Sequence, residues 1–224
     1  MSLLTRETLA SDDFITSAQA LNLPYEVMTD KDLKRSINET LAQSPADARP
    51  NGGLWVFCYG SLIWNPLFAF QDKRKAVLQD YRRGFFLKTI YGRGSVDKPG
   101  LVLALDERQG ARVEGQGLFL SGENIAYELF LLWRREMLFG SYVPRWVQTS
   151  CNGVTQSMLT FVIDKQGGRY AGDLSICDRI AMIRSGQGVL GSALDYFLQT
   201  KDCFEQHSIY CEEIDLIANA LRNS

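Results

Sequence analysis

The chain has 224 residues, which is enough for one sizeable domain with its own core or for two small ones. Hydrophobic residues make up 46% of it and charged residues 22%, a composition that is typical of a folded globular protein and argues against disorder. A formal net charge of −2 argues against a nucleic-acid or anionic-membrane partner, and no apolar run approaches the roughly 20 residues that a membrane-spanning helix needs.

Residues 1–53 are expected to form a peripheral extension that ends in a linker. A Thr-x-x-Asp capping box precedes Leu33, Ile37 and Leu41, which follow one another at intervals of four residues. This pattern predicts a surface helix with a narrow apolar stripe. Residues 44–53 are rich in proline, glycine and asparagine, as linkers are. The extension also lacks the apolar segment of a secretory signal peptide.

From residue 54 to residue 224 we expect one catalytic domain in which strands come first and most helices last. The continuous apolar run from Leu54 to Cys58 predicts a buried strand. Further strands are predicted, between turns, at residues 85–90, 101–105, 113–120, 143–149 and 157–163. A helix is predicted over residues 125–139, and the pattern after Asp173 is helical. Without βαβ alternation, this order predicts an α+β fold with six short strands in a small closed or half-closed barrel.

Several catalytic schemes lack their residues in this sequence. The one histidine, His207, lies in a polar helical pattern and is expected at the surface, and no Gly-x-Ser-x-Gly elbow is present for a serine triad. Histidines and cysteines at zinc-ligand spacing are absent as well. The five cysteines are odd in number and form no CxxC pair, which predicts a reducing, cytoplasmic setting. We therefore expect an enzyme with neither metal nor cofactor.

Residues 186–191 spell Gly-x-Gly-x-x-Gly, the pattern of dinucleotide-binding loops. That motif binds pyrophosphate only where it joins a strand to a helix inside a βαβ unit. Here the preceding residues 179–185 are themselves helical in pattern, and no βαβ unit surrounds them. The segment is therefore interpreted as a glycine-rich joint between two helices.

The segment Tyr59-Gly60-Ser61-Leu62 follows the first buried strand, so the chain is expected to turn there. Gly60 has no Cβ and can adopt a positive φ, which would turn successive backbone N–H groups into one concavity. Such a concavity binds an anion or a developing oxyanion, and Tyr59 and Ser61 would add hydroxyl groups. The alternative is an ordinary turn after a strand, and the tetrapeptide alone leaves both interpretations open.

Glu136 stands on the apolar face of the helix predicted over residues 125–139. It follows Leu132 by four residues and Trp133 by three, so at about 100° per residue it points into the middle of that face. The charged side chains of the same helix that are expected toward solvent are Glu128, Arg134 and Arg135.

A carboxylate in this position has two interpretations. An unpaired carboxylate in apolar surroundings usually responds with a raised pKa, which suits a general base that later acts as a general acid near neutral pH. The alternative is a structural salt bridge between Glu136 and an arginine that points inward. The arginines considered for that bridge are Arg82, Arg83, Arg93 and Arg145.

Four stretches of the sequence resemble, in the same order, the ChaC-like γ-glutamylcyclotransferases. Residues 56–66, Val-Phe-Cys-Tyr-Gly-Ser-Leu-Ile-Trp-Asn-Pro, resemble the signature with the GYGSL core. Residues 92–100 and 132–146 are similar to the next two blocks, and residues 185–191 look like the family's C-terminal glycine-rich turn. The resemblance covers about residues 55–198. Its most specific part is the combination of YGSL with a downstream Arg-Glu-x5-Tyr.

The resemblance implies a fold, a reaction and a set of site residues. The fold would be a small mixed β-barrel with packed helices and a helical C-terminal part. The reaction would be that of a lyase, in which the α-amine of a γ-glutamyl amide attacks the γ-carbonyl. In the ChaC branch the substrate partner is glutathione, and the products are 5-oxoproline and Cys-Gly. The general acid/base would be Glu136. The substrate-binding residues would be Val56, Phe57, Cys58, Tyr59, Gly60, Ser61, Leu62, Arg93 and Tyr142.

Two positions depart from the family's pattern. Cys58 stands where glycine is usual, which would narrow the pocket or make activity sensitive to oxidation. Leu101 stands where many relatives carry arginine, which casts doubt on a contact from there to a substrate carboxylate. Two other functions stay open: the same chemistry on γ-glutamyl amino acids or amines, and a binding module without catalysis. The sequence carries no signal of the oligomeric state.

Overall fold

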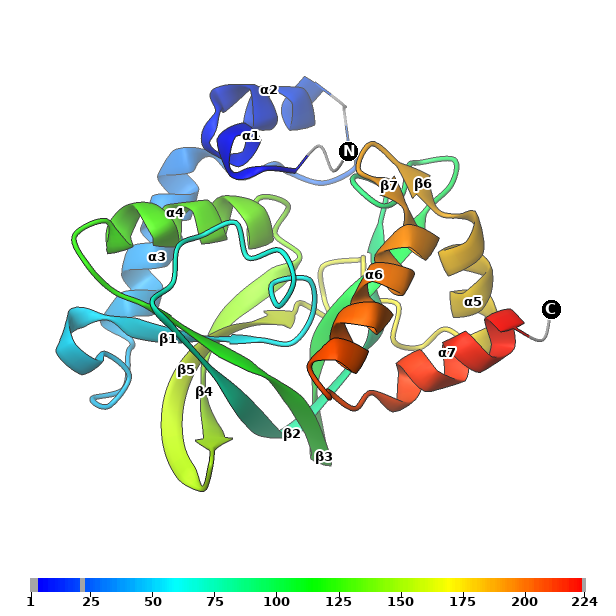
Figure 1. The fold of residues 1–224 in the computed structure, drawn as a ribbon. Helices are drawn as coiled ribbons and strands as arrows, with labels where there is room; N and C mark the ends of the chain where they lie inside the picture. Colours follow the sequence, from blue (N-terminus) through cyan, green and yellow to red (C-terminus); the bar gives the residue numbers. More distant parts are fainter. Residues whose placement is uncertain (1–3, 21–22, 223–224) are drawn as a thin grey trace.

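The computed structural model describes residues 4–20 and 23–222 and has a mixed α+β architecture, as predicted (Figure 1). The predicted extension and domain also include residues 1–3, 21–22 and 223–224, which lie outside the described residues. In chain order the elements are α1 (Arg6–Ala10), α2 (Asp12–Ala20), α3 (Asp30–Ala42), β1 (Leu54–Cys58), β2 (Asp72–Thr89), β3 (Gly100–Leu120), α4 (Ile125–Glu136), β4 (Tyr142–Cys151), β5 (Val154–Ile163), α5 (Ile176–Ser185), β6 (Gln187–Gly188), β7 (Gly191–Ser192), α6 (Ala193–Gln206) and α7 (Glu212–Arg222).

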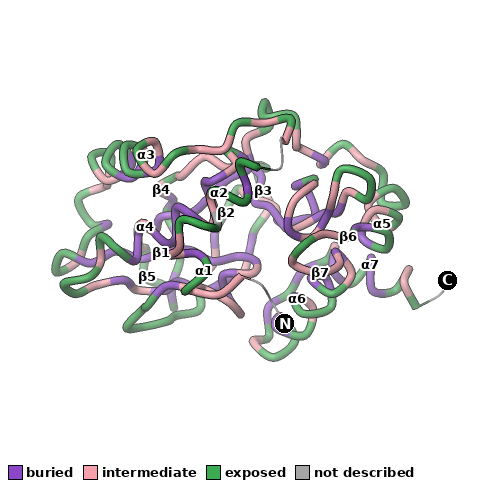
Figure 2. The backbone as a smooth tube through the Cα atoms, turned by 90° about the horizontal axis from the view of Figure 1, so that it is seen from above, coloured by how far each residue is buried: buried purple, intermediate pink, exposed green. Residues whose placement is uncertain are grey.

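Five strands close into a barrel with the order β1-β3-β2-β4-β5. All pairs are antiparallel except the one that closes the barrel, where β5 runs parallel to β1 at Val56 and Leu159. Every residue of β1 is buried, and buried positions follow the strands through the centre of the molecule (Figure 2). Closure pairs both sides of β1, so the end of this strand is held in a fixed place.

The strands differ from the prediction in number and length. Residues 101–105 and 113–120, predicted as two strands, belong to the single strand β3, because β2 pairs along almost all of it. Gly110, predicted as a break, lies inside β3 with a φ of 78°. Residues 72–84 of β2 escaped prediction because most of their side chains are charged or polar, and the four exposed residues at the start lack the alternation of a half-buried strand.

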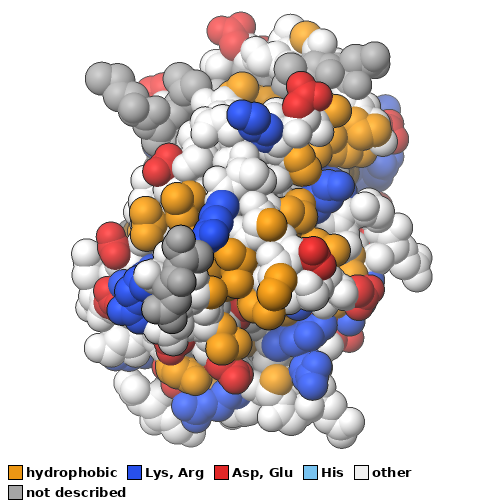
Figure 3. Space-filling model, turned by 90° about the vertical axis from the view of Figure 1, so that its right-hand side faces the viewer, with side chains coloured by type: hydrophobic (Ala, Val, Ile, Leu, Met, Phe, Trp, Pro, Cys, Tyr) orange, Lys and Arg blue, Asp and Glu red, His pale blue; other side chains and the backbone are white. Residues whose placement is uncertain are grey.

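Helices cover the barrel in two groups (Figure 1). On one side α1 and α3 contact α4, and the predicted apolar stripe of α3 is confirmed because Leu33 and Ile37 join the main core. On the other side α5, α6 and α7 pack on the long β2–β3 pair. The face with α5 and α7 mixes basic, acidic and hydrophobic side chains (Figure 3). Within the described residues no helix is long and apolar enough to span a bilayer.

Two charged residues of α4 that were predicted toward solvent are buried under the N-terminal segment. Arg134 is only 2% exposed, and Glu128, 6% exposed, pairs with Arg6 at 2.5 Å and accepts the N–H of Ala69 at 2.7 Å. The acceptors of the Arg134 guanidinium are the carbonyl oxygens of Leu9, Ala10 and Ser11 and the carboxylates of Asp12 and Asp30. The prediction was wrong because the pattern of one helix cannot show that a second layer covers its polar face.

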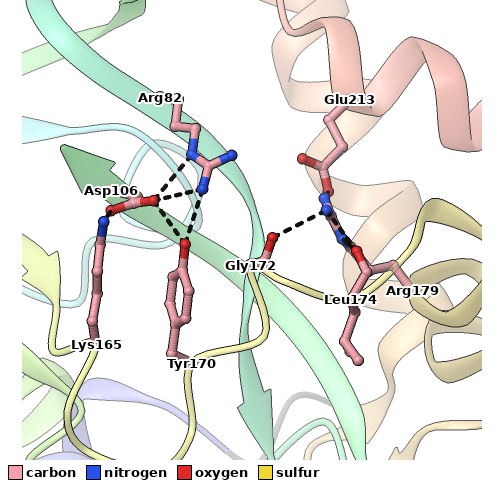
Figure 4. Close-up of polar contacts among 8 residues, drawn as sticks. All are labelled: Arg82, Asp106, Lys165, Tyr170, Gly172, Leu174, Arg179 and Glu213. Atoms are coloured by element: carbon pink, nitrogen blue, oxygen red, sulfur yellow. Dashed lines mark hydrogen bonds and ion pairs between the residues drawn. The ribbon is translucent and has the colours of Figure 1, made fainter. Parts of the chain in front are cut away.

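A buried ionic network ties the segment after β5 to the β2–β3 pair (Figure 4). Asp106 of β3 is fully buried and accepts hydrogen bonds from Arg82 at 2.8 Å and from the Tyr170 hydroxyl at 2.9 Å. The Lys165 ammonium lies 2.6 Å from the other carboxylate oxygen. Because Lys165 and Tyr170 come from the segment that joins β5 to α5, the network sets the path of that segment past the barrel.

Candidate active site

One cavity of about 180 Å³ opens where the end of β1, the β2–β3 loop, the end of α4 and the start of β4 meet. Its wall contains most of the residues that the sequence predicted for a site. Seven of the ten predicted residues line it: Tyr59, Gly60, Ser61, Leu62, Arg93, Glu136 and Tyr142. The fold therefore brings the loop and the carboxylate together, although they lie on separate elements.

The other three predicted residues, Val56, Phe57 and Cys58, lie in β1 with their side chains in the core, and they are not part of the cavity wall. Burial, and secondarily the Glu136 carboxylate, raises the pKa of the Cys58 thiol, which therefore stays protonated. The geometry does not support the expected narrowing of the pocket by Cys58, and a buried neutral thiol is a poor target for oxidation. Leu101 is likewise buried in the core.

Three consecutive residues of the loop after β1, Gly60, Ser61 and Leu62, belong to the cavity wall. The predicted positive φ at Gly60 is wrong, since this residue is not among those with positive φ. The turn is closed instead by the N–H of Ile63 to the Gly60 carbonyl at 3.0 Å and by that of Asn65 to the Ser61 carbonyl at 2.9 Å. Among the described residues, the N–H groups of Gly60, Ser61 and Leu62 meet no acceptor. N–H groups of this kind can bind an anionic oxygen. The turn that leaves them without an acceptor differs from the one predicted.

Glu136, the last residue of α4, forms a buried ion pair with the residue before it. Arg135 Nε lies 3.1 Å from Glu136 Oε1, and the two side chains are 6% and 13% exposed. Burial raises the pKa of Glu136, while the charge and the hydrogen bond of Arg135 oppose that rise. The expected rise of the pKa and the expected ion pair are thus both present, but the partner of Glu136 was predicted wrongly, and its role as general base stays a prediction. None of the candidates Arg82, Arg83, Arg93 and Arg145 is the partner, and Arg135 does not face solvent.

Arg135 also connects Glu136 to the loop after β1. One guanidinium nitrogen donates to the Ser61 hydroxyl at 3.0 Å, and another donates to the Asn65 carbonyl. Burial lowers the pKa of Arg135, and the Glu136 carboxylate opposes that effect. One buried cation therefore fixes the carboxylate and the loop relative to each other, as a preorganised site requires.

Three tyrosine hydroxyls share the cavity with the carboxylate. Tyr59 donates to a backbone carbonyl of β5 at 2.8 Å, Tyr142 donates to one of β3 at 3.3 Å, and Tyr196 accepts the N–H of Leu103 at 3.3 Å. Burial raises the pKa of all three phenols, and the negative charge of Glu136 adds to the rise. They are neutral hydroxyl groups at physiological pH.

Two further arginines line the cavity. Arg93 comes from the β2–β3 loop, lies 6.0 Å from the centre of the Tyr196 ring and reaches Gln199 at 3.4 Å. Arg169 comes from the segment after β5 and donates to the Phe139 carbonyl at 2.7 Å. Burial lowers the pKa of both guanidinium groups. Neither forms an ion pair with a carboxylate of the described residues, so each can receive an anionic group of a ligand.

The glycine-rich joint holds the loop that carries Arg93. Residues 186–191 lie between α5 and α6, as predicted, and together with Ser192 they form the β6–β7 hairpin. A Cβ on Gly188 would lie 2.3 Å from the carbonyl oxygens of both Gly92 and Gly94, and the N–H of Leu190 donates to the Gly92 carbonyl at 2.8 Å. Only glycine permits this approach, which explains the motif without a dinucleotide.

Among the residues of the cavity wall that sequence reasoning did not predict are Tyr196, Arg135 and Arg169. Tyr196 has the helical spacing of a core residue, Arg135 was placed in solvent by helix phase, and Arg169 lies in a segment without periodicity. The adjacency of Arg135 to Glu136 in the Arg-Glu-x5-Tyr motif was the one usable signal. His207, predicted at the surface, is the half-buried C-cap of α6 and is not part of the cavity wall.

Comparisons with known proteins place the chain in a family. The model of the ChaC-like protein family matches residues 54–223. The glutathione-specific gamma-glutamylcyclotransferase of Escherichia coli (strain K12) is 33% identical over 195 residues, 87% of this chain and 81% of that protein. Glutathione-specific gamma-glutamylcyclotransferase 1 of Homo sapiens is 30% identical over 164 residues, 72% of this chain and 74% of that protein.

The fold is similar to that of a solved relative. The crystal structure of a yeast γ-glutamyl cyclotransferase specific to glutathione has a TM-score of 0.69 at 15% identity, and the match covers 76% of this chain and 96% of that one. At this identity the likeness concerns the fold alone. Because the family model matches most of its length and a relative at 33% identity is covered over four fifths, the chain belongs to the ChaC-like protein family.

Proposed function

We propose that this chain is a γ-glutamylcyclotransferase that acts on glutathione and releases 5-oxoproline and Cys-Gly. The observation that carries the proposal is the position of Glu136, a buried carboxylate with a raised pKa, in one cavity with the unengaged N–H groups of the loop after β1. The names of the relatives supply the substrate, since both are called glutathione-specific.

In the proposed mechanism Glu136 carries the proton. The α-ammonium group of the γ-glutamyl residue gives a proton to the carboxylate, and the free amine then attacks the γ-carbonyl carbon. A carbon–nitrogen bond forms to close the five-membered ring. Glu136 returns the proton to the amide nitrogen as the old carbon–nitrogen bond breaks, so one group serves as base and then as acid. The ring nitrogen still carries one proton more than 5-oxoproline, and it passes this proton to the released amine, which leaves as the ammonium of Cys-Gly. The substrate brings its own nucleophile, so no enzyme nucleophile is required.

The loop after β1 would stabilise the charge that develops during the attack. The carbonyl oxygen becomes an oxyanion when the amine adds, and the N–H groups of Gly60, Ser61 and Leu62 are available to it. Arg135 holds this loop and Glu136 in fixed positions relative to each other, so no reorganisation is needed when the charge appears. The cavity wall would hold the amine near the carbonyl, which supplies the proximity contribution.

We also propose that residues 54–224 form the catalytic domain and residues 1–53 an extension to it. The start of the family match at residue 54 supports this boundary. The extension is nevertheless close to the site, because Leu4 is part of the cavity wall. A cytoplasmic location, and the absence of nucleic-acid and membrane partners, stay predictions from the sequence.

The proposal is tested by chromatographic detection of 5-oxoproline and Cys-Gly after incubation of the purified protein with glutathione. Release of both, with a kcat/KM at least about tenfold above that for γ-glutamyl amino acids and γ-glutamyl amines, is the expected result. Faster turnover of γ-glutamyl amino acids or amines would show that these compounds, and not glutathione, are the substrates. Glutathione binding without any product between about pH 6 and pH 9 would instead indicate a binding module.

A further inference from the structure

Arg169 is a half-buried cation of the cavity wall that pairs with no carboxylate within the described residues. Arg135 pairs with Glu136, and Arg93 has Asp195 nearby, whereas the described groups that counteract the lowering of the Arg169 pKa by burial are the phenols of Tyr25 and Tyr142. Removing a guanidinium from water without a counter-charge is unfavourable. A ligand with an anionic group would offset that cost.

The backbone around Arg169 is held from several sides. Its carbonyl accepts the N–H of Lys88 at 2.9 Å, and the N–H of Ala171 donates to the Phe86 carbonyl at 2.7 Å, so the segment is bound along β2. The next residue, Tyr170, belongs to the network around Asp106 (Figure 4). These contacts fix the stem of the arginine before any ligand arrives.

The guanidinium itself is seated by two other segments. It lies 4.3 Å from the centre of the Tyr25 ring, and one nitrogen donates to the Phe139 carbonyl at 2.7 Å. A cation over an aromatic ring keeps its orientation at little cost, and a guanidinium has five N–H donors, more than these contacts use. Tyr25 lies before residue 54, so the N-terminal extension contributes this seat.

Arg169 and Arg93 stand near different groups of the site. The Arg169 guanidinium donates to the Phe139 carbonyl and lies 5.8 Å from the centre of the Phe139 ring, in the segment that joins Glu136 to Tyr142. Arg93 lies instead beside Tyr196, whose hydroxyl would be 3.7 Å from a Cβ on Gly60 of the loop. The cavity thus carries one cation toward the loop after β1 and another on the Tyr142 side.

Glutathione has two carboxylates for these two cations. One is bonded to the carbon that carries the attacking amine, and must stay near the reacting γ-carbonyl and the loop. The other ends the leaving peptide. We propose that Arg169, seated by Tyr25, binds the terminal carboxylate of the leaving peptide and so selects γ-glutamyl peptides that end in a free carboxylate. This inference rests on the proposed function and names the substrate class of that site.

The test compares glutathione with its glycine amide, which lacks only the terminal charge. For the unaltered protein we expect a KM roughly 10- to 100-fold higher for the amide, as for loss of a charged hydrogen bond, with kcat little changed. Arg169→Gln should raise the KM for glutathione by a similar factor and leave that for the amide within about threefold. Arg169→Lys should recover part of the loss, because it keeps the charge.

Two more variants separate recognition from folding. Tyr25→Leu should raise the KM for glutathione alone, by a smaller factor, because it removes the seat but not the cation. Arg108→Gln, a matched change at an exposed arginine of β3, should alter neither KM.

Equal KM values of the unaltered protein for glutathione and for the amide would overturn the inference. An equal rise in the KM for both substrates in Arg169→Gln would overturn it as well. The first of these comparisons needs no variant and therefore decides even if Arg169→Gln does not fold. Absence of 5-oxoproline from both substrates would contradict the proposed function instead.

Discussion

Arg135 shows how much a single residue can contribute to a site without being the reacting group. Helix phase correctly predicted that Glu136 points inward, because its neighbours on the helix are apolar. The same reasoning placed Arg135 in solvent. It missed that the loop after β1, from another part of the chain, supplies Ser61 and the Asn65 carbonyl as buried partners. The apolar pattern of a helix shows which face meets the core. It carries no information about segments that pack on the polar face.

The variant Arg135→Gln tests this coupling through the pH dependence of kcat/KM. Burial already lifts the pKa of Glu136 above its ordinary 4.5, and Arg135 holds it down. In the proposed mechanism the carboxylate is the active base, so kcat/KM should fall as the pH falls through this pKa. Without the Arg135 charge the pKa rises further, and the acid limb moves to higher pH. Arg135→Lys, which keeps the charge, should stay close to the unaltered profile. An acid limb that stays in place or moves to lower pH in Arg135→Gln would exclude the coupling.

Among the elements, the glycine-rich joint was located correctly from its sequence pattern. The loop that this joint contacts could not be predicted in the same way. Glycine spacing and the lack of a βαβ unit sufficed to predict a joint between two helices. The partner of Gly188 is the loop of Gly92 and Gly94, far away in the chain, and no local pattern links them. The long strand β3 was divided into two for a similar reason. It pairs with β2 on both sides of Gly110, across a register shift, whereas local propensity alone predicts a break there.

Gly188→Ala should disturb both the stability and the position of Arg93. The added Cβ would meet two carbonyl oxygens at 2.3 Å, which we expect to lower the free energy of unfolding by roughly 1–3 kcal/mol and to raise KM as the loop shifts. Urea denaturation and steady-state kinetics measure the two effects. Gly167→Ala is the matched control, since its nearest neighbour is a side-chain oxygen at 3.3 Å. Unchanged values in Gly188→Ala would show that the hairpin does not hold the loop.

For the whole molecule, the main difference between the structure and the sequence-based prediction concerns the N-terminal extension. Its composition predicted a peripheral segment, yet Leu33 and Ile37 lie in the main core and Leu4 lies in the cavity wall. The contacts that hold it run from charged residues of α4 to backbone carbonyls, which have no signature in a sequence. The barrel itself was predicted because its strands follow apolar runs, which are visible locally.

Arg134→Met should loosen the extension. The change leaves the carbonyl groups of Leu9, Ala10 and Ser11 without their donor, so we expect a loss of about 2–4 kcal/mol in the stability of this segment. Limited proteolysis should then cut before residue 29 at least tenfold faster, while the barrel remains intact. Arg35→Met, at an exposed arginine of α3, should leave the rate unchanged. Equal cutting rates in both variants would mean that Arg134 does not anchor the extension.

The central claim is that the Glu136 carboxylate carries the proton of the cyclisation, and Glu136→Gln tests it most directly. The substitution keeps the shape and polarity of the side chain but removes its ability to exchange a proton. We expect 5-oxoproline release from glutathione to fall by at least about 10²-fold in kcat, with a folded protein that still binds glutathione. A kcat within a few-fold of the unaltered protein would contradict the account.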